Sequence, residues 1–448
     1  MATSLNEPQA AAKQFSSFGI SRRRAIGVSM FLACSAASPS SGHENLLAQS
    51  PSMAAFEEYW TALSDLDLVA LRRAAHNDLA VAFSDGVALL AAGNHQQAES
   101  SFVAMSRQHS DANIAVASEI LLAITLLGEQ EWTKLRDVIA NSQLSPADRK
   151  HTEELGRWGK AFASVDRPVT ILPQSPVTLD LNLSPLGTPT VQVLINGREY
   201  RFWLDTGSSM TVLSSDVAAR ASVPLIGSDT LTVGTFAGVA SARPAVLARM
   251  EIGPIALLNV PAIVIDADLM RVKVRREGIP SSGLEIDGII GWDTIRQFSI
   301  SIDYKHGTIA IQAPERLGTI GTPSQNLTWF GKPIIEVRTK SGQTLHFALD
   351  TGAQVTLLNA SVLDKVRIRP QTSTARLLGI AQAEGRMVRG VAALELEVAG
   401  KSVELKDLAV SNRVPWNLVN CDGVLGSDIS HSGTIRIDAT NGLFSIGL

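Results

Sequence analysis

The sequence contains little cysteine and no excess of positive charge. Its 448 residues include two cysteines, Cys34 and Cys421, too few for a disulfide framework or a cysteine-based metal site. The 8 histidines show no metal-ligand spacing, and we expect neither a metal nor another cofactor. The net charge of -4 leaves no electrostatic footprint for nucleic acid, which is therefore excluded as an expected partner.

Apolar residues are abundant by contrast. They make up 45% of the chain, against 18% charged residues, which is enough to build sizeable hydrophobic cores. The length predicts roughly two or three domains. Because disulfides are excluded, the stability of these domains must come from packing.

The N-terminus has the layout of an export signal. Arginines at 22–24 precede an apolar run, Ala25–Ala37, that is too short to cross a membrane. Ser21–Arg23 resembles a twin-arginine signal, and the residues before Cys34 resemble a lipoprotein cleavage box, which would make Cys34 a lipid anchor. We expect residues 1–50 to be an export signal and linker, and the protein to be periplasmic or associated with the cell envelope. A cytosolic protein with an apolar tail is the alternative.

Residues 51–165 are expected to form a helical domain, because their apolar residues follow a three-four spacing. Four residues fall at the spacings of a tetratricopeptide hairpin: Gly86, Gly93, Ala98 and Phe102. Gly128 repeats Gly93 after 35 residues. A single matching hairpin also fits a plain helical bundle. Either arrangement predicts a domain that docks a protein partner or serves as a spacer.

Prolines in residues 166–177 predict a linker, after which short apolar or alternating runs separated by turn residues predict strands. The expected fold is thus multidomain, with a tetratricopeptide-like helical domain followed by two homologous all-β lobes. We place the lobes at residues 178–312 and 333–448, joined by a linker at 313–332.

The two lobes are inferred from a repeat. Phe202–Leu213 reads FWLDTGSSMTVL and Phe347–Leu358 reads FALDTGAQVTLL, with their aspartates 145 positions apart. Around each Asp-Thr-Gly, four other landmarks recur in order: a turn glycine before it, then a later glycine, an apolar-apolar-Gly segment and a further aspartate. The copies differ mainly by about ten residues inserted in the first, within residues 271–285.

An Asp-Thr-Gly turn at the end of an apolar strand holds a carboxylate on a rigid backbone. The glycine lets the chain reverse, and the threonine hydroxyl can tie two such turns together. Two turns face to face would bring Asp205 and Asp350 so close that they share one proton. The ionised carboxylate can then activate a water while the protonated one polarises a carbonyl. The alternative is that each aspartate only caps its own turn.

These residues resemble the retropepsin-like aspartic peptidases in a single-chain, two-lobed form. Leu204–Ser208 and Leu349–Ala353 match the active-site turns of that family, and Ile289–Gly291 and Val424–Gly426 match the segment threaded behind each turn. The resemblance implies an acid-protease fold, peptide-bond hydrolysis and the two aspartates as the catalytic pair. It assigns to the active-site turns Thr206, Gly207, Ser208, Thr351, Gly352 and Ala353. The two threonines would interlock.

The resemblance also implies a flap over the cleft. We place the flaps at the hairpins around Gly234 and Gly379, with Phe236 covering the substrate, and ordinary hairpin turns are the alternative. Neither hairpin carries the tyrosine of the best-known two-lobed members, so each copy resembles a retroviral-type half. Asp293 and Asp428, which follow the apolar-apolar-Gly segments, are expected to cap short helices.

The expected function is an aspartic endopeptidase acting on polypeptides, with its site formed between the two lobes of one chain. Pairing of like lobes between two chains is the alternative arrangement. The alternative function is a catalytically silent scaffolding protein that works through its helical domain. Intact turns in both lobes favour the enzyme, because a scaffold needs no like-charge pair that lowers its stability.

Overall fold

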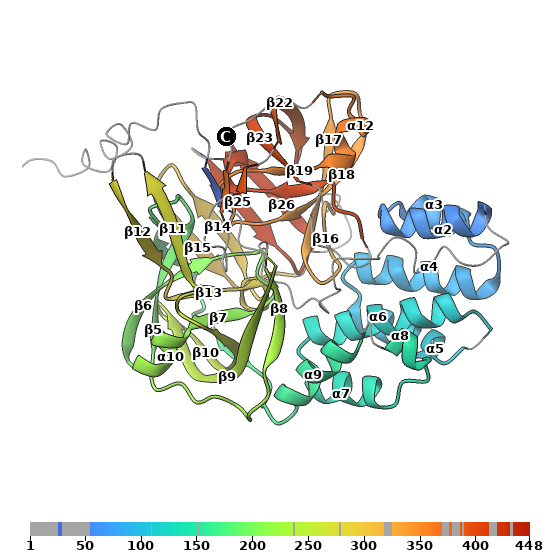
Figure 1. Ribbon diagram of the computed structural model, residues 1–448, viewed down its shortest axis with the longest axis horizontal. Helices are drawn as coiled ribbons and strands as arrows, with labels where there is room; N and C mark the ends of the chain where they lie inside the picture. The colour runs from blue at the N-terminus through green and yellow to red at the C-terminus, as the bar shows by residue number, and fades with distance from the viewer. Residues whose placement is uncertain are drawn as a thin grey trace, which may run out of the picture.

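The computed structural model describes most of the chain after residue 53 (Figure 1). The described residues are 26–28, 54–108, 110–149, 152–235, 238–276, 279–317, 325–369, 376–378, 386–387, 389–411, 419–430 and 433–448. Of the expected export segment, only the short strand β1 (Ile26–Val28) is described, and it runs parallel to β20 (Arg376–Leu378). Cys34 lies outside the described residues. Among the described helices, none is long and apolar enough to cross a membrane.

The described residues between 54 and 162 form the expected helical region. Its helices are α2 (Ala54–Ser64), α3 (Leu68–Arg73), α4 (Asp78–Ala91), α5 (His95–Ser106), α6 (Ala112–Gly128), α7 (Trp132–Ala140), α8 (Pro146–Arg149) and α9 (Glu153–Phe162). Asn77 and Asp111 start α4 and α6, because their side chains accept hydrogen bonds from N–H groups of the first turn. The apolar faces bury large aromatic side chains such as Phe83, Phe102 and Trp158.

The turns between these helices differ from the expected repeat. Gly93, with φ 73°, joins α4 to α5. Between α6 and α7 the residue in the left-handed region is Gln130, with φ 56°. The expected equivalence of Gly128 and Gly93 is therefore wrong. Gly128 is the last residue of α6, where the absence of a side chain lets Trp329 of the second lobe pack against the helix.

Lobe one is a closed ring of strands. Following hydrogen-bonded neighbours, the ring runs β5-β6-β13-β7-β10-β9 and returns to β5. These strands are β5 (Pro189–Ile195), β6 (Arg198–Leu204), β7 (Thr211–Ser214), β9 (Gly238–Ile252), β10 (Ile255–Ile265) and β13 (Gly288–Ile290). Attached to the ring are β2 (Val169–Ile171), β4 (Asn182–Leu183), β8 (Leu231–Thr235) and the helices α10 (Ser215–Arg220) and α11 (Trp292–Ile295). The inserted residues add a separate hairpin, β11 (Arg271–Arg276) and β12 (Ile279–Glu285).

Lobe two repeats this ring strand for strand. Its order is β17-β18-β24-β19-β23-β22 and back to β17. The strands are β17 (Pro333–Thr339), β18 (Thr344–Leu349), β19 (Leu357–Asn359), β22 (Arg389–Val398), β23 (Lys401–Ser411) and β24 (Gly423–Leu425). The remaining elements are β16 (Leu327–Trp329), β21 (Arg386–Met387), α12 (Ala360–Lys365) and the 3-10 helix η1 (Ser427–Ser430). The repeat in the sequence is therefore a repeat in topology.

A shared sheet joins the two lobes in the centre of the molecule (Figure 1). Its order is β26-β25-β14-β15-β3, built from β3 (Val177–Asp180), β14 (Ser299–Asp303), β15 (Thr308–Gln312), β25 (Thr434–Asp438) and β26 (Leu443–Gly447). At its middle, β14 and β25 pair with Ile300 opposite Ile437 and Ile302 opposite Ile435. All four isoleucines are buried, so an apolar joint holds the lobes together.

Both segments expected to be linkers contain strands. Within residues 166–177, β2 pairs with β10 and lies at the edge of the sheet of lobe one, the position where nearby prolines disturb a sheet least. Within residues 313–332, β16 pairs with β17 of lobe two. The prolines end the helical region, but the chain enters the sheet earlier than the pattern indicated.

The helical region lies against lobe one (Figure 1). The side chain of Glu154 in α9 accepts a hydrogen bond of 2.8 Å from the N–H of Thr232 on β8, the last strand of its sheet. Glu129, which follows α6, lies 2.6 Å from Arg296, which follows α11. These contacts couple the helices to two elements of the same lobe.

The same helices also contact lobe two, through β16. The ring of Trp329 packs on Gly128, and its centroid lies 5.3 Å from that of His95. Gly331 approaches Ile124 of α6. The C-terminal end of α6 therefore occupies the corner where all three parts meet.

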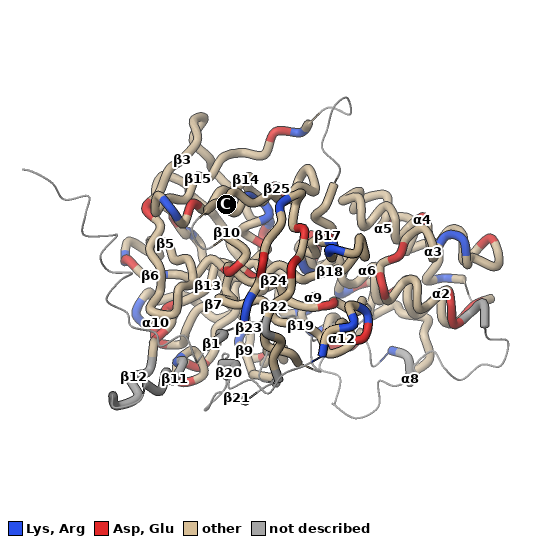
Figure 2. The backbone as a smooth tube through the Cα atoms, turned by 90° about the horizontal axis from the view of Figure 1, so that it is seen from above, with Lys and Arg blue, Asp and Glu red and all other residues tan. Residues whose placement is uncertain are grey.

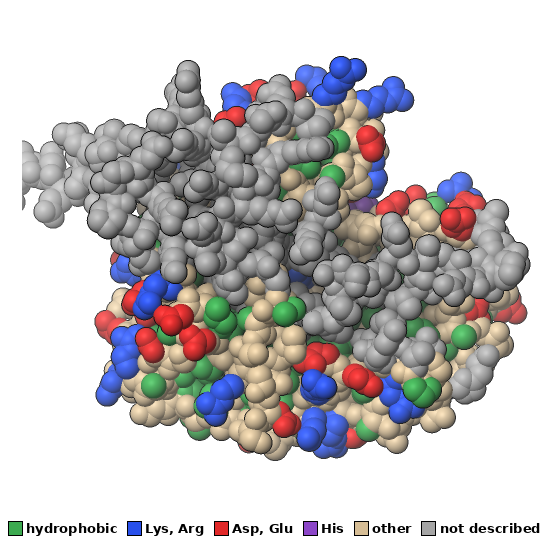
Figure 3. All heavy atoms as spheres, in the orientation of Figure 1, with side chains coloured by type: hydrophobic (Ala, Val, Ile, Leu, Met, Phe, Trp, Pro, Cys, Tyr) green, Lys and Arg blue, Asp and Glu red, His purple; other side chains and the backbone are tan. Residues whose placement is uncertain are grey.

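Charged residues of both signs are interspersed along the described backbone (Figure 2), and both occur together on the described face of lobe one (Figure 3). One ion pair occupies the equivalent place in each lobe: Arg220 with Asp287 at 3.4 Å in lobe one, and Lys365 with Asp422 at 2.9 Å in lobe two. The basic residue of each pair is the last residue of a short helix, α10 after β7 and α12 after β19. These pairs are a further trace of the duplication.

Gly128→Ala is expected to destabilise the protein, although alanine normally favours a helix over glycine by about 1 kcal/mol. A Cβ at this position would lie 2.2 Å from the ring of Trp329, and overpacking of this kind costs about 1–3 kcal/mol. Thermal unfolding of G128A, W329A and the double variant measures the coupling. In the W329A background the alanine should become neutral or stabilising, and an equal loss in both backgrounds would contradict this account.

Candidate active site

Asp205 and Asp350 lie at equivalent places, each directly after a strand whose last three residues are buried. β6 leads to Asp205 and β18 to Asp350, and their N–H groups donate to Ile290 O at 3.1 Å and to Leu425 O at 3.0 Å. The strands that supply these carbonyls, β13 and β24, run parallel to β6 and β18. Both aspartates are 0% exposed. The repeat thus brings two carboxyl groups to one buried interface.

The threonines interlock the two turns. Thr206 Oγ1 accepts a hydrogen bond from the N–H of Thr351 at 3.0 Å and donates to the carbonyl of Leu349 at 2.9 Å. Thr351 Oγ1 accepts from the N–H of Thr206 at 3.1 Å and donates to the carbonyl of Leu204 at 2.8 Å. These reciprocal hydrogen bonds cross the lobe interface within a single chain.

The glycines of the turns make room for the opposite carboxyl group. A Cβ on Gly207 would lie 2.7 Å from Cγ of Asp350, and a Cβ on Gly352 would lie 2.6 Å from Cγ of Asp205. Any side chain at either position would displace the facing carboxylate. Sequence reasoning gave these glycines the role of reversing the chain, and their close approach across the interface is a second role.

The environment of Asp205 disfavours its ionised form. Its Oδ1 accepts from the N–H groups of Gly207 at 2.8 Å and Ser208 at 3.1 Å, whereas Oδ2 accepts no hydrogen bond from the described residues. Burial and the charge of Asp350 raise the pKa of Asp205 well above its ordinary value, against the lowering effect of the two N–H donors. Oδ1 of Asp350 accepts from the N–H of Ala353 at 2.9 Å.

The residue after each glycine ties its turn to the threaded segment. Ser208 Oγ donates to the carbonyl of Met210 at 2.7 Å, and the carbonyl of Ser208 accepts from the N–H of Trp292 at 2.7 Å. Ala353 has no hydroxyl, and its carbonyl accepts from both the N–H and the Oγ of Ser427, at 2.9 and 3.1 Å. Both lobes therefore make the same backbone connection, whereas the hydroxyl groups differ: that of Ser208 bonds within its own turn, and that of Ser427 adds to the connection in lobe two.

Asp293 and Asp428 do not cap helices, so that prediction is wrong. The N-cap of α11 is Gly291, and both aspartates lie inside the first turn of their helix. Asp428 accepts from the N–H and Oγ1 of Thr356, both at 2.7 Å, and Asp293 accepts from Oγ1 of Thr211 at 3.3 Å. Each carboxyl group thus holds the chain that leaves an Asp-Thr-Gly turn. Burial raises the pKa of Asp293 to about 7.

The first expected flap is a hairpin of β8 and β9, in which Gly234 lies opposite Val239. Val239 is 62% exposed near the end of this hairpin. Phe236 lies outside the described residues, and so does Gly379 in the second hairpin. The flap assignment remains a prediction.

Thr188 and Gln354 form a contact that the sequence analysis missed. Gln354 Nε2 donates to Oγ1 of Thr188 at 2.9 Å, and that hydroxyl lies 3.3 Å from the carbonyl of Gly352, to which it donates. This is a second link between the lobes, immediately beside the turn. The residue of lobe one that corresponds to Gln354 is Ser209, which lines a cavity with the helical region instead. A position-by-position alignment of the two copies would have marked this difference.

Comparison with known proteins agrees with the internal repeat. Residues 191–294 and 335–429 each match the model of the aspartyl protease family. Both lobes match the aspartyl protease family. Among solved structures, an aspartic proteinase from Irpex lacteus is similar at 14% sequence identity with a TM-score of 0.38, covering 61% of this chain and 97% of that chain. No curated protein matches the chain in sequence. The matched aspartyl protease segments begin after the helical region, which they do not include.

Replacing Thr206 by valine is expected to lower stability strongly. Valine keeps the shape but leaves the N–H of Thr351 and the carbonyl of Leu349 buried without this partner. Each unsatisfied group costs about 1–3 kcal/mol, so the free energy of unfolding should fall by about 2–6 kcal/mol. Urea unfolding measures the loss. Thr206→Ser is the control, because it retains the hydroxyl, and equal stability of the two variants would refute the role of these hydrogen bonds.

Asp205→Asn is expected to stabilise the protein at neutral pH. The folded-state pKa of Asp205 lies above its unfolded value, so ionisation opposes folding increasingly as the pH rises between the two values. Asparagine removes this penalty, and its advantage should fade as the pH falls to the range where an unfolded aspartate is protonated. Urea unfolding at pH 7.5 and at acid pH tests this, with the exposed Asp364→Asn as control. A gain that does not depend on pH would contradict the argument.

Proposed function

We propose that this protein is an aspartic endopeptidase whose active site lies between its two lobes. The observation that carries the proposal is the reciprocal packing of the turns, in which each buried aspartate rests on the glycine of the other turn. Two carboxyl groups fixed in this way cannot both be charged without large repulsion. They are suited to hold one proton and one negative charge, which is the requirement for acid-base hydrolysis of an amide.

The two aspartates then take different roles. We assign the shared proton to Asp205, on the Oδ2 atom that accepts no hydrogen bond from the described residues. Asp350 is the ionised partner and takes a proton from a water bound between the two groups. Asp205 donates its proton to the scissile carbonyl as the water attacks. The tetrahedral intermediate collapses as Asp350 passes the proton taken from water to the leaving amine and Asp205 removes a proton from a hydroxyl of the intermediate, so the dyad again holds one proton.

The substrate is a polypeptide, in keeping with the family that both lobes match. The site belongs to a single chain, since the threonine hydrogen bonds and the pairing of β14 with β25 join lobe one to lobe two. The sequence of residues 1–50 supports export to the periplasm or cell envelope, with Cys34 as a candidate lipid anchor. The helical region is a candidate docking surface for a protein partner.

Asp205→Asn and Asp350→Asn are each expected to abolish cleavage of a mixed peptide library, with the double variant little worse than either single variant, because the pair acts as a unit. The fall in kcat/KM should be about 1,000-fold or more. Cleavage near the wild-type rate by either variant would exclude the dyad. A wild-type protein that cleaves nothing from pH 3 to 8 would favour the scaffolding alternative.

Mixing the two single variants tests the single-chain site. Because each chain carries one damaged half of its own site, the mixture should stay inactive if lobe one pairs with lobe two of the same molecule. Recovered cleavage in the mixture, together with a dimer by light scattering, would assign the site to two chains.

A further inference from the structure

The two lobes support their active-site turns differently. In lobe two, both oxygens of Asp428 accept hydrogen bonds from Thr356, at 2.7 Å each. In lobe one, Oδ1 of Asp293 accepts from Oγ1 of Thr211 at 3.3 Å, whereas Oδ2 accepts from Nε2 of Gln130 at 3.4 Å. Gln130 belongs to the helical region. A side chain from outside the lobe therefore takes part in the support of the lobe-one turn, whereas both oxygens of Asp428 bond to Thr356 of their own lobe.

The position of Gln130 is fixed from several directions. Its φ of 56° places it in the left-handed turn after α6, where its N–H donates to Leu127 O at 3.0 Å. The residue before it, Glu129, is 2.6 Å from Arg296 in lobe one. Hydrogen bonding to His95 and the charge of Arg296 lower the pKa of Glu129 to about 2, although burial alone would raise it. The amide of Gln130 is thus delivered by an anchored helix end.

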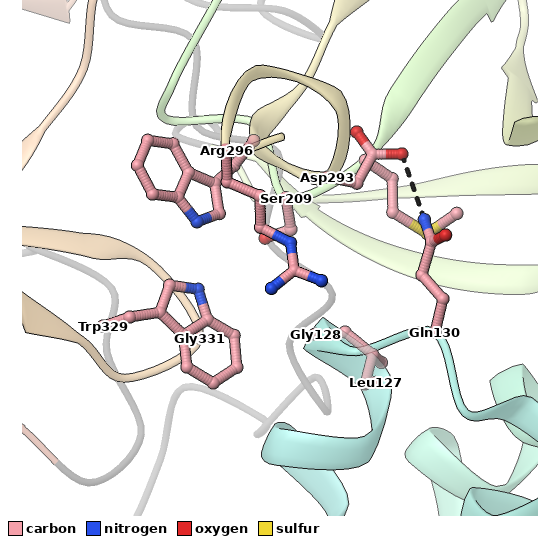
Figure 4. Close-up of a pocket in the computed structure, with 10 residues that line it drawn as sticks. Leu127, Gly128, Gln130, Ser209, Asp293, Arg296, Trp329 and Gly331 are labelled. Carbon is pink, nitrogen blue, oxygen red and sulfur yellow. Dashed lines mark hydrogen bonds between the residues drawn. The ribbon is translucent and has the colours of Figure 1, made fainter. Parts of the chain in front are cut away.

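This helix end lies beside the residues that follow the turn of Asp205. Gln130, Ser209, Met210 and Asp293 line one cavity of about 10 Å³, no larger than a water needs (Figure 4). Figure 4 shows the amide of Gln130 pointing to the carboxyl group of Asp293 from the side of the helices. Ser209 and Met210 connect the Asp-Thr-Gly turn to Thr211, the residue that Asp293 holds. Gln130 is thus connected to Asp205 through Asp293, Thr211 and the chain between Thr211 and Asp205.

We propose that Gln130 is a positioning residue of the active site, through which the helical region holds the lobe-one turn and its aspartate in register with lobe two. The inference rests on the proposed peptidase function. It makes the helical region a part of the catalytic apparatus, in addition to any role in docking a partner. Asp205 would then be positioned by the helical region as well as by the two lobes.

Two variants of Gln130 separate positioning from stability. Gln130→Gly removes the amide but suits the left-handed backbone, so its melting temperature should equal or exceed that of the wild type. Gln130→Met keeps the length of the side chain and removes the hydrogen-bond donor. Ser222→Gly is the matched control, because Ser222 of lobe one is exposed, has φ 55° and likewise follows a helix, α10.

Both Gln130 variants of the full chain should lower kcat about 2- to 10-fold with little change in KM, which is the effect of one lost hydrogen bond on a group that acts in the transition state. Hydrogen–deuterium exchange of residues 205–213 should be faster in both variants, and Ser222→Gly should change neither quantity. Unchanged kcat and unchanged exchange in Gln130→Gly would overturn the proposal. If the proposed function is wrong, the Asp205→Asn variant will still cleave peptides. In that case the exchange measurement still decides whether Gln130 positions the turn.

Discussion

Two buried carboxyl groups held against each other are the constraint on which the architecture depends. A pair of buried carboxyl groups repel each other and lose hydration, so nothing local favours their meeting. The protein opposes that cost with the threonine hydrogen bonds across the interface, with glycines that leave space, and with an apolar shared sheet that fixes the lobes from the opposite side. Each device is duplicated, because each lobe supplies one half of it. The fold can be understood as the means of keeping this pair together.

The duplication has not remained symmetric. The hydroxyl of Ser208 bonds within its own turn, whereas in lobe two the hydroxyl of Ser427 bonds to Ala353. Among the described residues, the hairpin β11–β12 is found in lobe one and not in lobe two. The helical region adds a further difference. Gln130 bonds to Asp293 of lobe one, whereas Gly128 packs against Trp329 of lobe two. An unequal pair of lobes suits a reaction in which the two aspartates carry different charges.

Much of this arrangement could be predicted from the sequence because a repeat constrains it. The Asp-Thr-Gly turns, the threaded segments and the inserted hairpin each have a fixed offset from an aspartate, and such offsets can be read directly from the sequence. Asp293 was misjudged, because an aspartate after glycine has the pattern of a cap, and only the fold brings Thr211 to it. Gln130 gave no signal, and the spacing of Gly128 from Gly93 indicated a helical repeat where the fold has the packing of Trp329. Their partners lie in other domains, and no periodicity connects residues so far apart in the chain.

The contact between Glu154 and Thr232 has a consequence for how the lobes behave when separated. β8 is the last strand of its sheet, and an uncovered edge strand offers unpaired N–H and C=O groups to any other strand it meets. The helix α9 occupies part of this edge with a carboxylate, which accepts a hydrogen bond but cannot continue a β-ladder. The helices thus shield the lobe from self-association. Lobes produced without them would present a template for strand addition between molecules, and solubility would be the first property lost.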